Sequence, residues 1–151
     1  MNVWNETPRL DGVRVLLVEG APQVREVVAD VLGQCGAHMT VVDSAVAGLA
    51  VLKQERPDAL VSSLSMPDKD GYWLIREVRK LPPDQGGDVP AVAFTGLTTA
   101  EDRLATLRAG FQYHVPKPVA LSRLAWVVAL LTLKKSEAGE HGATMALSPG
   151  G

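Results

Sequence analysis

Cysteine is scarce and long apolar runs are absent in this chain of 151 residues, and each absence excludes a class of protein. The single cysteine, Cys35, excludes an internal disulfide and fits a reducing compartment. No apolar run reaches the roughly 20 residues that a membrane-spanning helix needs. The first residues also lack the basic-then-apolar pattern of a secretory signal. We therefore expect a cytoplasmic protein that does not insert into a membrane.

A strong excess of charge of either sign is also missing. Lysine and arginine number 15 against 17 aspartates and glutamates, and the net charge of -2 gives no general attraction to nucleic acid. Hydrophobic residues make up 46% of the chain and charged residues 21%, a balance typical of a globular domain. We expect one domain with a real core, without direct contact with nucleic acid.

Short apolar runs alternate with segments of helical periodicity along the chain. The apolar runs predict five strands, at residues 13–18, 38–42, 59–62, 91–94 and 111–115. The periodic segments predict five helices, at residues 22–35, 45–56, 71–81, 100–109 and 119–134. This alternation is typical of an α/β fold, a doubly wound parallel sheet with helices on both faces.

The ends of the chain differ in composition from this alternating region. Residues 1–10 are polar and read as a leader or linker, and residues 11–134 form the predicted domain. Residues 135–151 are rich in glycine, alanine and serine, and we expect them to be a flexible tail.

Motifs at the predicted strand ends carry a resemblance to a known family. Ser63 follows the third strand and precedes Met66-Pro67 and Asp70-Gly71, and later motifs are Phe94-Thr95-Gly96 and Pro116-Lys117-Pro118. In this order and spacing they resemble the receiver domains of bacterial response regulators. The similarity is closest to the C-terminal receivers of hybrid sensor histidine kinases. It implies a flavodoxin-like sheet with strand order 2-1-3-4-5 and a role in two-component, phosphorelay signal transduction.

The resemblance also shows which parts of the family's site have changed. In that family an acidic pair and an acceptor aspartate hold Mg²⁺, and a hydroxyl and a lysine contact the phosphoryl oxygens. Glu19 matches the first acid, but Gly20 stands at the second and Ser63 at the acceptor position, whereas Thr95 and Lys117 match. Asp68 and Asp70 are implied to lie in the loop after the third strand. We expect very weak or no Mg²⁺ binding, no other cofactor and no catalytic residue.

Several single residues allow two interpretations. Lys117 is expected near Glu19, either as a structural ion pair or as a contact that fixes one switch state. Thr95 is either a hydroxyl that bonds nearby backbone or the family's moving switch residue. His114 stands where the family often has a switching aromatic, and it is equally well explained as a half-buried surface histidine.

The final predicted helix carries two apolar stripes. Leu121, Leu124, Val127, Val128 and Leu131 should face the sheet, and a second stripe holds Trp126, Leu130 and Leu133. The second stripe is either part of a broad buried face, or covered by the tail, or a surface for a homodimer or another partner.

Two functions of different classes follow from these observations. The leading hypothesis is a pseudo-receiver, not an enzyme, that docks on a sensor kinase or another signalling protein without being phosphorylated. The alternative is a small-molecule or anion-binding domain that uses the altered pocket at Glu19, Ser63, Thr95 and Lys117. No glycine-rich phosphate fingerprint supports nucleotide binding. We expect no DNA-binding output, because no further domain follows the final helix.

Overall fold

The computed structural model describes residues 7–117 and 121–140 and contains one parallel sheet of five strands in the order β2-β1-β3-β4-β5. The strands are β1 (Arg14–Val18), β2 (His38–Val42), β3 (Ala59–Ser62), β4 (Ala91–Thr95) and β5 (Tyr113–Pro116). Every neighbouring pair is parallel. The predicted fold class and strand order are therefore confirmed.

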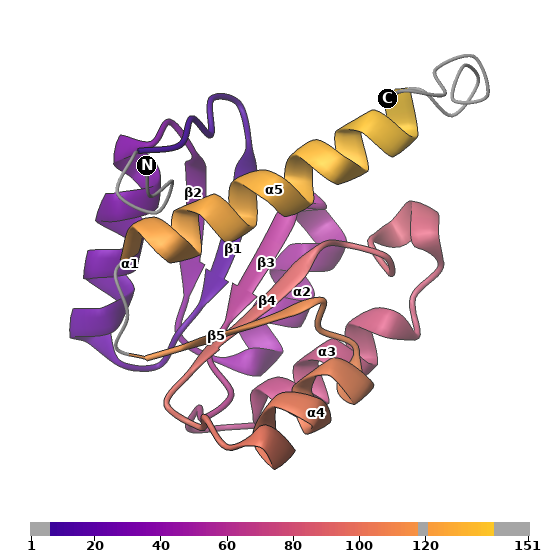
Figure 1. The fold of residues 1–151 in the computed structure, drawn as a ribbon. Coiled ribbons are helices and arrows are strands. Elements are labelled where there is room, and N and C mark those ends of the chain that lie inside the picture. Colours follow the sequence, from indigo (N-terminus) through magenta and orange to yellow (C-terminus); the bar gives the residue numbers. More distant parts are fainter. Residues whose placement is uncertain (1–6, 118–120, 141–151) are drawn as a thin grey trace.

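Helices cover both faces of this sheet, as Figure 1 shows. They are α1 (Pro22–Gln34), α2 (Ala45–Glu55), α3 (Gly71–Arg79), α4 (Ala100–Ala109) and α5 (Leu121–Glu140), with a short 3-10 turn, η2, at Pro83–Gln85. Helices α1 and α5 lie on one face, and α2, α3 and α4 lie on the other (Figure 1). The sheet is thus the central layer of three.

Each face of the sheet has its own apolar core, because strand side chains alternate between the two faces. In β1, Val15 and Leu17 pack with α1 and α5, while Leu16 and Val18 pack with α2 and α3. All residues of β3 and β4 are buried, as expected for central parallel strands. The core therefore fixes the strand ends, where the candidate site lies.

Several predicted boundaries differ from the structure. Leu10, the last residue of the predicted leader, is only 1% exposed, and its N–H donates to Cys35 O at 2.7 Å. The fifth strand begins at Tyr113 and not at residue 111, because Phe111 still closes the turn after α4 by donating to Thr106 O. Helix α5 ends at Glu140, beyond the predicted end at residue 134 and inside the expected tail.

The longer α5 agrees with local helix propensity, since residues 134–140 hold two lysines, two glutamates and one alanine, and no proline interrupts them. The predicted leader over residues 1–6 and the rest of the predicted tail, residues 141–151, lie outside the described residues. Among the described residues, no helix is both long and apolar enough to cross a membrane.

Candidate functional site

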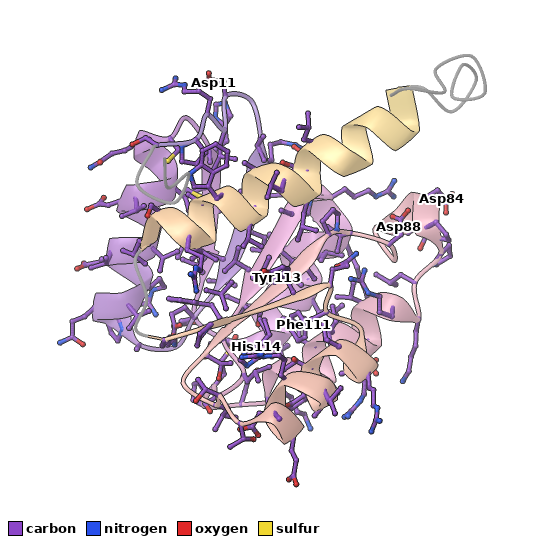
Figure 2. All side chains as sticks on the ribbon, viewed as in Figure 1. Asp11, Asp84, Asp88, Phe111, Tyr113 and His114 are labelled. Atoms are coloured by element: carbon purple, nitrogen blue, oxygen red, sulfur yellow. The ribbon has the colours of Figure 1, made fainter. Side chains whose placement is uncertain are left out.

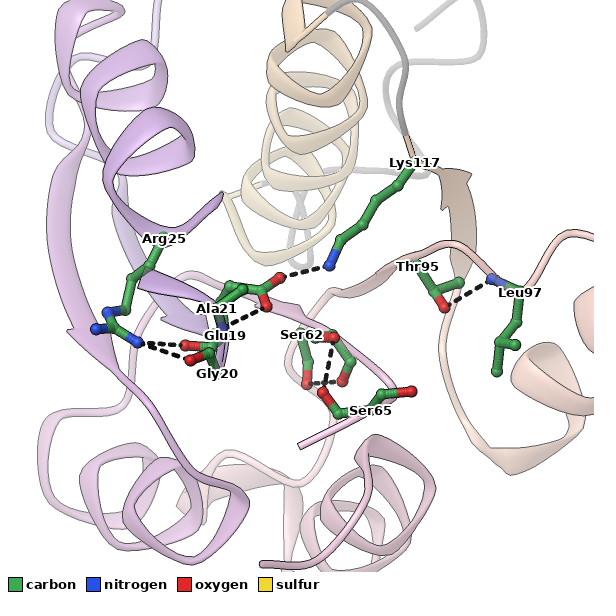
Figure 3. Close-up of polar contacts among 10 residues, drawn as sticks. Glu19, Gly20, Ala21, Arg25, Ser62, Ser65, Thr95, Leu97 and Lys117 are labelled. Carbon is green, nitrogen blue, oxygen red and sulfur yellow. Dashed lines mark hydrogen bonds and ion pairs between the residues drawn. The ribbon is translucent and has the colours of Figure 1, made fainter. Parts of the chain in front are cut away.

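The predicted site residues come together at the carboxyl edge of the sheet. Glu19 follows β1, Ser63 follows β3, Thr95 ends β4 and Lys117 follows β5. In an open parallel sheet this edge is where ligands and chemistry gather. Figure 3 shows Glu19, Thr95 and Lys117 around this edge.

Glu19 and Lys117 form a partly buried ion pair, as the sequence predicted. Lys117 Nζ lies 2.7 Å from Glu19 Oε1, and the two side chains are 23% and 3% exposed. The other carboxylate oxygen of Glu19, Oε2, accepts a hydrogen bond from the Ala21 N–H at 3.1 Å. Both oxygens of the one remaining carboxylate therefore already have partners within the protein (Figure 3).

Gly20 lies in a loop held by Arg25, a contact that the sequence analysis missed. The Arg25 guanidinium donates to the carbonyls of Glu19 and Gly20, at 2.9 and 3.3 Å. A Cβ atom on Gly20 would meet Pro67 Cδ at 3.2 Å, which is tighter than an ordinary contact. Pro67, in the loop after β3, therefore restricts the space beside this residue.

Ser63, at the acceptor position, is 4% exposed and held by local hydrogen bonds. Its N–H donates to Val18 O at 2.9 Å, and its hydroxyl donates to Ser65 O at 3.2 Å. The hydroxyl proton thus faces a neutral carbonyl. A carbonyl is not a base that could activate serine as a nucleophile.

Thr95 and His114 both bind the backbone of Leu97. Thr95 Oγ1 accepts from the Leu97 N–H at 3.1 Å, and His114 Nε2 lies 2.7 Å from Leu97 O. Because a carbonyl only accepts, Nε2 carries the proton. This contact agrees with the interpretation of Thr95 as a hydroxyl that bonds nearby backbone.

The interpretation of His114 as a half-buried surface residue is wrong, since its side chain is only 6% exposed. His114 pairs with Ala93 in the sheet register and lies on the side of β5 toward α4, as Figure 2 shows. Its second ring nitrogen, Nδ1, is buried and has no hydrogen-bond partner. The ring is therefore held inward by one strong contact, to Leu97.

The two acidic residues of the loop after β3 bind helix N-termini. Asp68 accepts from the N–H groups of Ala45 and Val46 at 3.1 and 2.9 Å, and these begin α2. The hydrogen bond from Val46 is the main cause that lowers the pKa of Asp68 below 3.8. Asp70 accepts from Trp73 N–H at 2.8 Å and caps α3. Neither acid stands at the acceptor position.

The second stripe of α5 reaches solvent. Leu130 and Leu133 are 52% and 58% exposed, and Trp126 is partly exposed, whereas Leu124, Val127 and Val128 are buried against the sheet. The interpretation of a broad buried face is therefore wrong for Leu130 and Leu133. Cover by residues 141–151 lies outside the described residues.

The strand order β2-β1-β3-β4-β5, with a carboxylate, hydroxyls and a lysine at the carboxyl edge, defines a flavodoxin-like doubly wound domain. The model of the response regulator receiver domain family matches residues 15–129, so the chain belongs to that family. It is a receiver domain of two-component signalling, a class of module that contacts kinases and other signalling partners.

Two relatives and one solved structure illustrate the likeness. The chain is 41% identical over 105 residues to an uncharacterized 14.6 kDa protein in the sodA1 3' region of Leptolyngbya boryana, covering 70% of this chain and 79% of that protein. It is 34% identical over 137 residues to response regulator MprA of Mycobacterium ulcerans, covering 90% of this chain and 57% of MprA. The chain thus spans little more than half of MprA.

Among solved structures, the signal receiver domain of a signal transduction histidine kinase from Syntrophus aciditrophicus is 28% identical, with a TM-score of 0.74. The match covers 82% of this chain and 92% of that domain.

The Mg²⁺ that the receiver family implies does not fit the residues at this edge. Within the described parts of the chain, no group of three or more histidine, cysteine or acidic residues is placed to hold a metal ion. Of the described residues at the matched family positions, only Glu19 carries a carboxylate, and both of its oxygens are engaged. Magnesium prefers several oxygen ligands and usually one or two free carboxylates.

Proposed function

We propose that this protein is a pseudo-receiver, a receiver domain that docks on a signalling partner without being phosphorylated and without catalysing a reaction. The proposal rests on one observation: a serine, Ser63, stands at the acceptor position, and its hydroxyl donates a hydrogen bond to Ser65 O. A serine cannot form the acyl phosphate of an aspartate. Forming a phosphate ester would require a base beside the hydroxyl.

The switch positions are also held by contacts that need no phosphoryl group. Lys117, which contacts the phosphoryl oxygens in the family, is paired with Glu19. Thr95 and His114 together hold the N–H and the carbonyl of Leu97 in the loop after β4. We infer that the surface next to this loop keeps one shape, which suits a module recognised in a single state.

The partner we propose is a sensor kinase or another cytoplasmic signalling protein. The 28% identity to a histidine kinase receiver supports a relation to the receivers of hybrid kinases. The exposed stripe of α5, Trp126, Leu130 and Leu133, is the surface we propose for a homodimer, because exposed apolar clusters mark interaction sites. The net charge of -2 favours a protein partner over nucleic acid.

The alternative of an anion-binding pocket has less support. Lys117, Thr95 and Ser63 each already contact a group of the protein, at 2.7, 3.1 and 3.2 Å. An anion would have to displace these contacts, so we do not propose it.

The test is incubation with acetyl phosphate and MgCl₂ followed by intact mass measurement, with an aspartate-containing receiver as the positive control. We expect no added phosphoryl group on this protein while the control gains one. An acid-stable or labile phosphoryl adduct on the wild-type chain would contradict the proposal.

A further inference from the structure

The Glu19 carboxylate is almost completely shielded from bulk water, which would otherwise solvate its charge. Its side chain is 3% exposed, so it needs a cation within the protein. Lys117 Nζ supplies that cation at 2.7 Å, and the backbone of Lys117 is fixed by its own N–H, which donates to Thr95 O at 2.7 Å. The ammonium also lies 5.4 Å from the centre of the Phe94 ring, a distance that allows a favourable cation–π contact.

Glycine stands at the position of the second carboxylate, and Pro67 restricts the space beside it. Pro67 Cδ would lie 3.2 Å from a Cβ atom on Gly20. The next residue, Asp68, ties this loop to the start of α2 through the N–H groups of Ala45 and Val46. Pro67 is therefore held beside Gly20 by the contacts of its neighbour.

We propose that Lys117 is the resident cation of this site and stands in for the divalent ion of the family. The single buried carboxylate is then neutralised by the chain itself, and the site is complete without metal. This inference deepens the proposed pseudo-receiver, but it concerns charge at Glu19 and does not require that Ser63 resist phosphorylation.

The inference predicts that removing the ammonium creates a need for another cation. In Lys117→Ala, Glu19 is left buried without a counter-charge, which is strongly unfavourable. A hard divalent cation with its own water ligands is the natural replacement beside a lone carboxylate. The wild-type protein, with the ammonium in place, has no such need.

The experiment compares thermal unfolding in 20 mM MgCl₂ with unfolding in NaCl of matched ionic strength. We expect no difference for wild type, and a Tm for Lys117→Ala that is lowered in NaCl and raised by about 3 °C or more in MgCl₂. The matched control is Glu19→Gln/Lys117→Ala, which lacks the carboxylate and should not respond to MgCl₂.

Three results would overturn the inference: stabilisation of the wild type by MgCl₂, no response of Lys117→Ala, or an equal response of the double variant. If Lys117→Ala does not fold in NaCl, Lys117→Gln replaces it in the same comparison, since glutamine keeps a donor for Glu19 but carries no charge. Acetyl phosphate is absent from these measurements, so their failure would leave the phosphorylation result unaffected.

Discussion

Thr95 and His114, on the neighbouring strands β4 and β5, hold the two backbone polar groups of one residue, Leu97. The imidazole reaches the carbonyl from a buried position, while its other nitrogen, Nδ1, has no partner. A buried polar atom without a partner is unfavourable, so the inward position of His114 must be stabilised by the Leu97 bond and by packing.

Replacing His114 by phenylalanine should separate the contribution of the Leu97 hydrogen bond to stability from that of ring packing. His114→Phe loses the bond to Leu97 O, worth about 1 kcal/mol, but also removes the unpartnered Nδ1, whose burial costs about 1–3 kcal/mol. We expect the free energy of unfolding to stay within about 1 kcal/mol of wild type. His114→Ala leaves a cavity and should lose about 2–4 kcal/mol.

Urea unfolding measures both variants, and amide exchange at residues 97–99 should become faster in each. An equal loss of stability in the two variants would show that ring volume does not hold His114 in place.

Asp68 gives a prediction about pH. Hydrogen bonds, led by that from Val46 N–H, lower the pKa of Asp68 from 3.8. A lowered pKa in the folded state means that Asp68 stabilises the fold above pH 3.8, and that this contribution disappears as the pH falls through the folded-state pKa.

Asp68→Asn should therefore have a lower Tm than wild type at pH 6, and the difference should shrink below pH 3.8. Scanning calorimetry of the two proteins over this pH range provides the measurement. Asp84→Asn, on the exposed turn η2, is the control for removing one surface charge. A difference in Tm between Asp68→Asn and wild type that is independent of pH would contradict the assigned role of the Asp68 charge.

Arg56 ends α2 with a φ of 49°, in the left-handed region that favours glycine. A residue with a Cβ atom pays about 1–2 kcal/mol there. The Arg56 guanidinium recovers part of this by donating to Asp84 O at 2.8 Å. We expect Arg56→Gly to raise the free energy of unfolding by about 0.5–1 kcal/mol.

Arg56→Ala is the matched control, because alanine keeps the unfavourable φ and loses the bond to Asp84. Urea unfolding should rank glycine above arginine and arginine above alanine. A glycine variant less stable than wild type would mean that the Asp84 contact dominates.

The fold could be predicted because its apolar strands and amphipathic helices have distinct periodicities. The Glu19–Lys117 pair could be predicted as well, since both residues follow central strands whose ends meet at one edge. The contact of Asp68 with α2 could not, because it joins a loop to the start of a helix 23 residues earlier and no local pattern marks it. The burial of His114 was equally hidden, since it depends on where the backbone of Leu97 lies.

Arg25 shows a further limit of prediction from sequence. An arginine in the first turns of a helix usually reads as a solvent-exposed charge. Here its guanidinium turns back to the carbonyls of Glu19 and Gly20, six and five residues away. This contact depends on the path of the loop before α1, which places the two carbonyls near Arg25, and no sequence pattern predicts that path.

The exposed stripe of α5 leads to a prediction about assembly. Leu133 is 58% exposed, so Leu133→Glu should leave folding intact and weaken a dimer formed through α5. Trp126→Glu tests the same stripe nearer the core. Leu104→Glu, on α4 with 50% exposure, is the control for placing an acid on an apolar surface position elsewhere.

Light scattering over a range of protein concentrations gives the mass. We expect a concentration-dependent dimer for wild type and Leu104→Glu, and a monomer for Leu133→Glu and Trp126→Glu. The same mass for all four proteins would remove α5 as the dimer surface.

Restoring the acceptor alone should not restore phosphorylation. Ser63→Asp would place a second carboxylate in a buried position near Glu19, where like charges oppose each other. Phosphoryl transfer would still lack the acid at Gly20, and Pro67 restricts the space for one. We expect Ser63→Asp to be less stable than wild type and to gain no phosphoryl group from acetyl phosphate and MgCl₂.

Gly20→Asp/Ser63→Asp/Lys117→Ala is the informative comparison, because it supplies two carboxylates beside Glu19 and removes the resident ammonium. That variant should be stabilised by MgCl₂ even if it is not phosphorylated, since the family's lysine is then missing. Intact mass reports phosphorylation and thermal unfolding reports metal binding, so the two effects are read separately. Phosphorylation of Ser63→Asp on its own would show that Glu19 and Lys117 suffice for the reaction once an aspartate is present. Ser63 would then be the one feature that prevents phosphorylation of the wild-type domain.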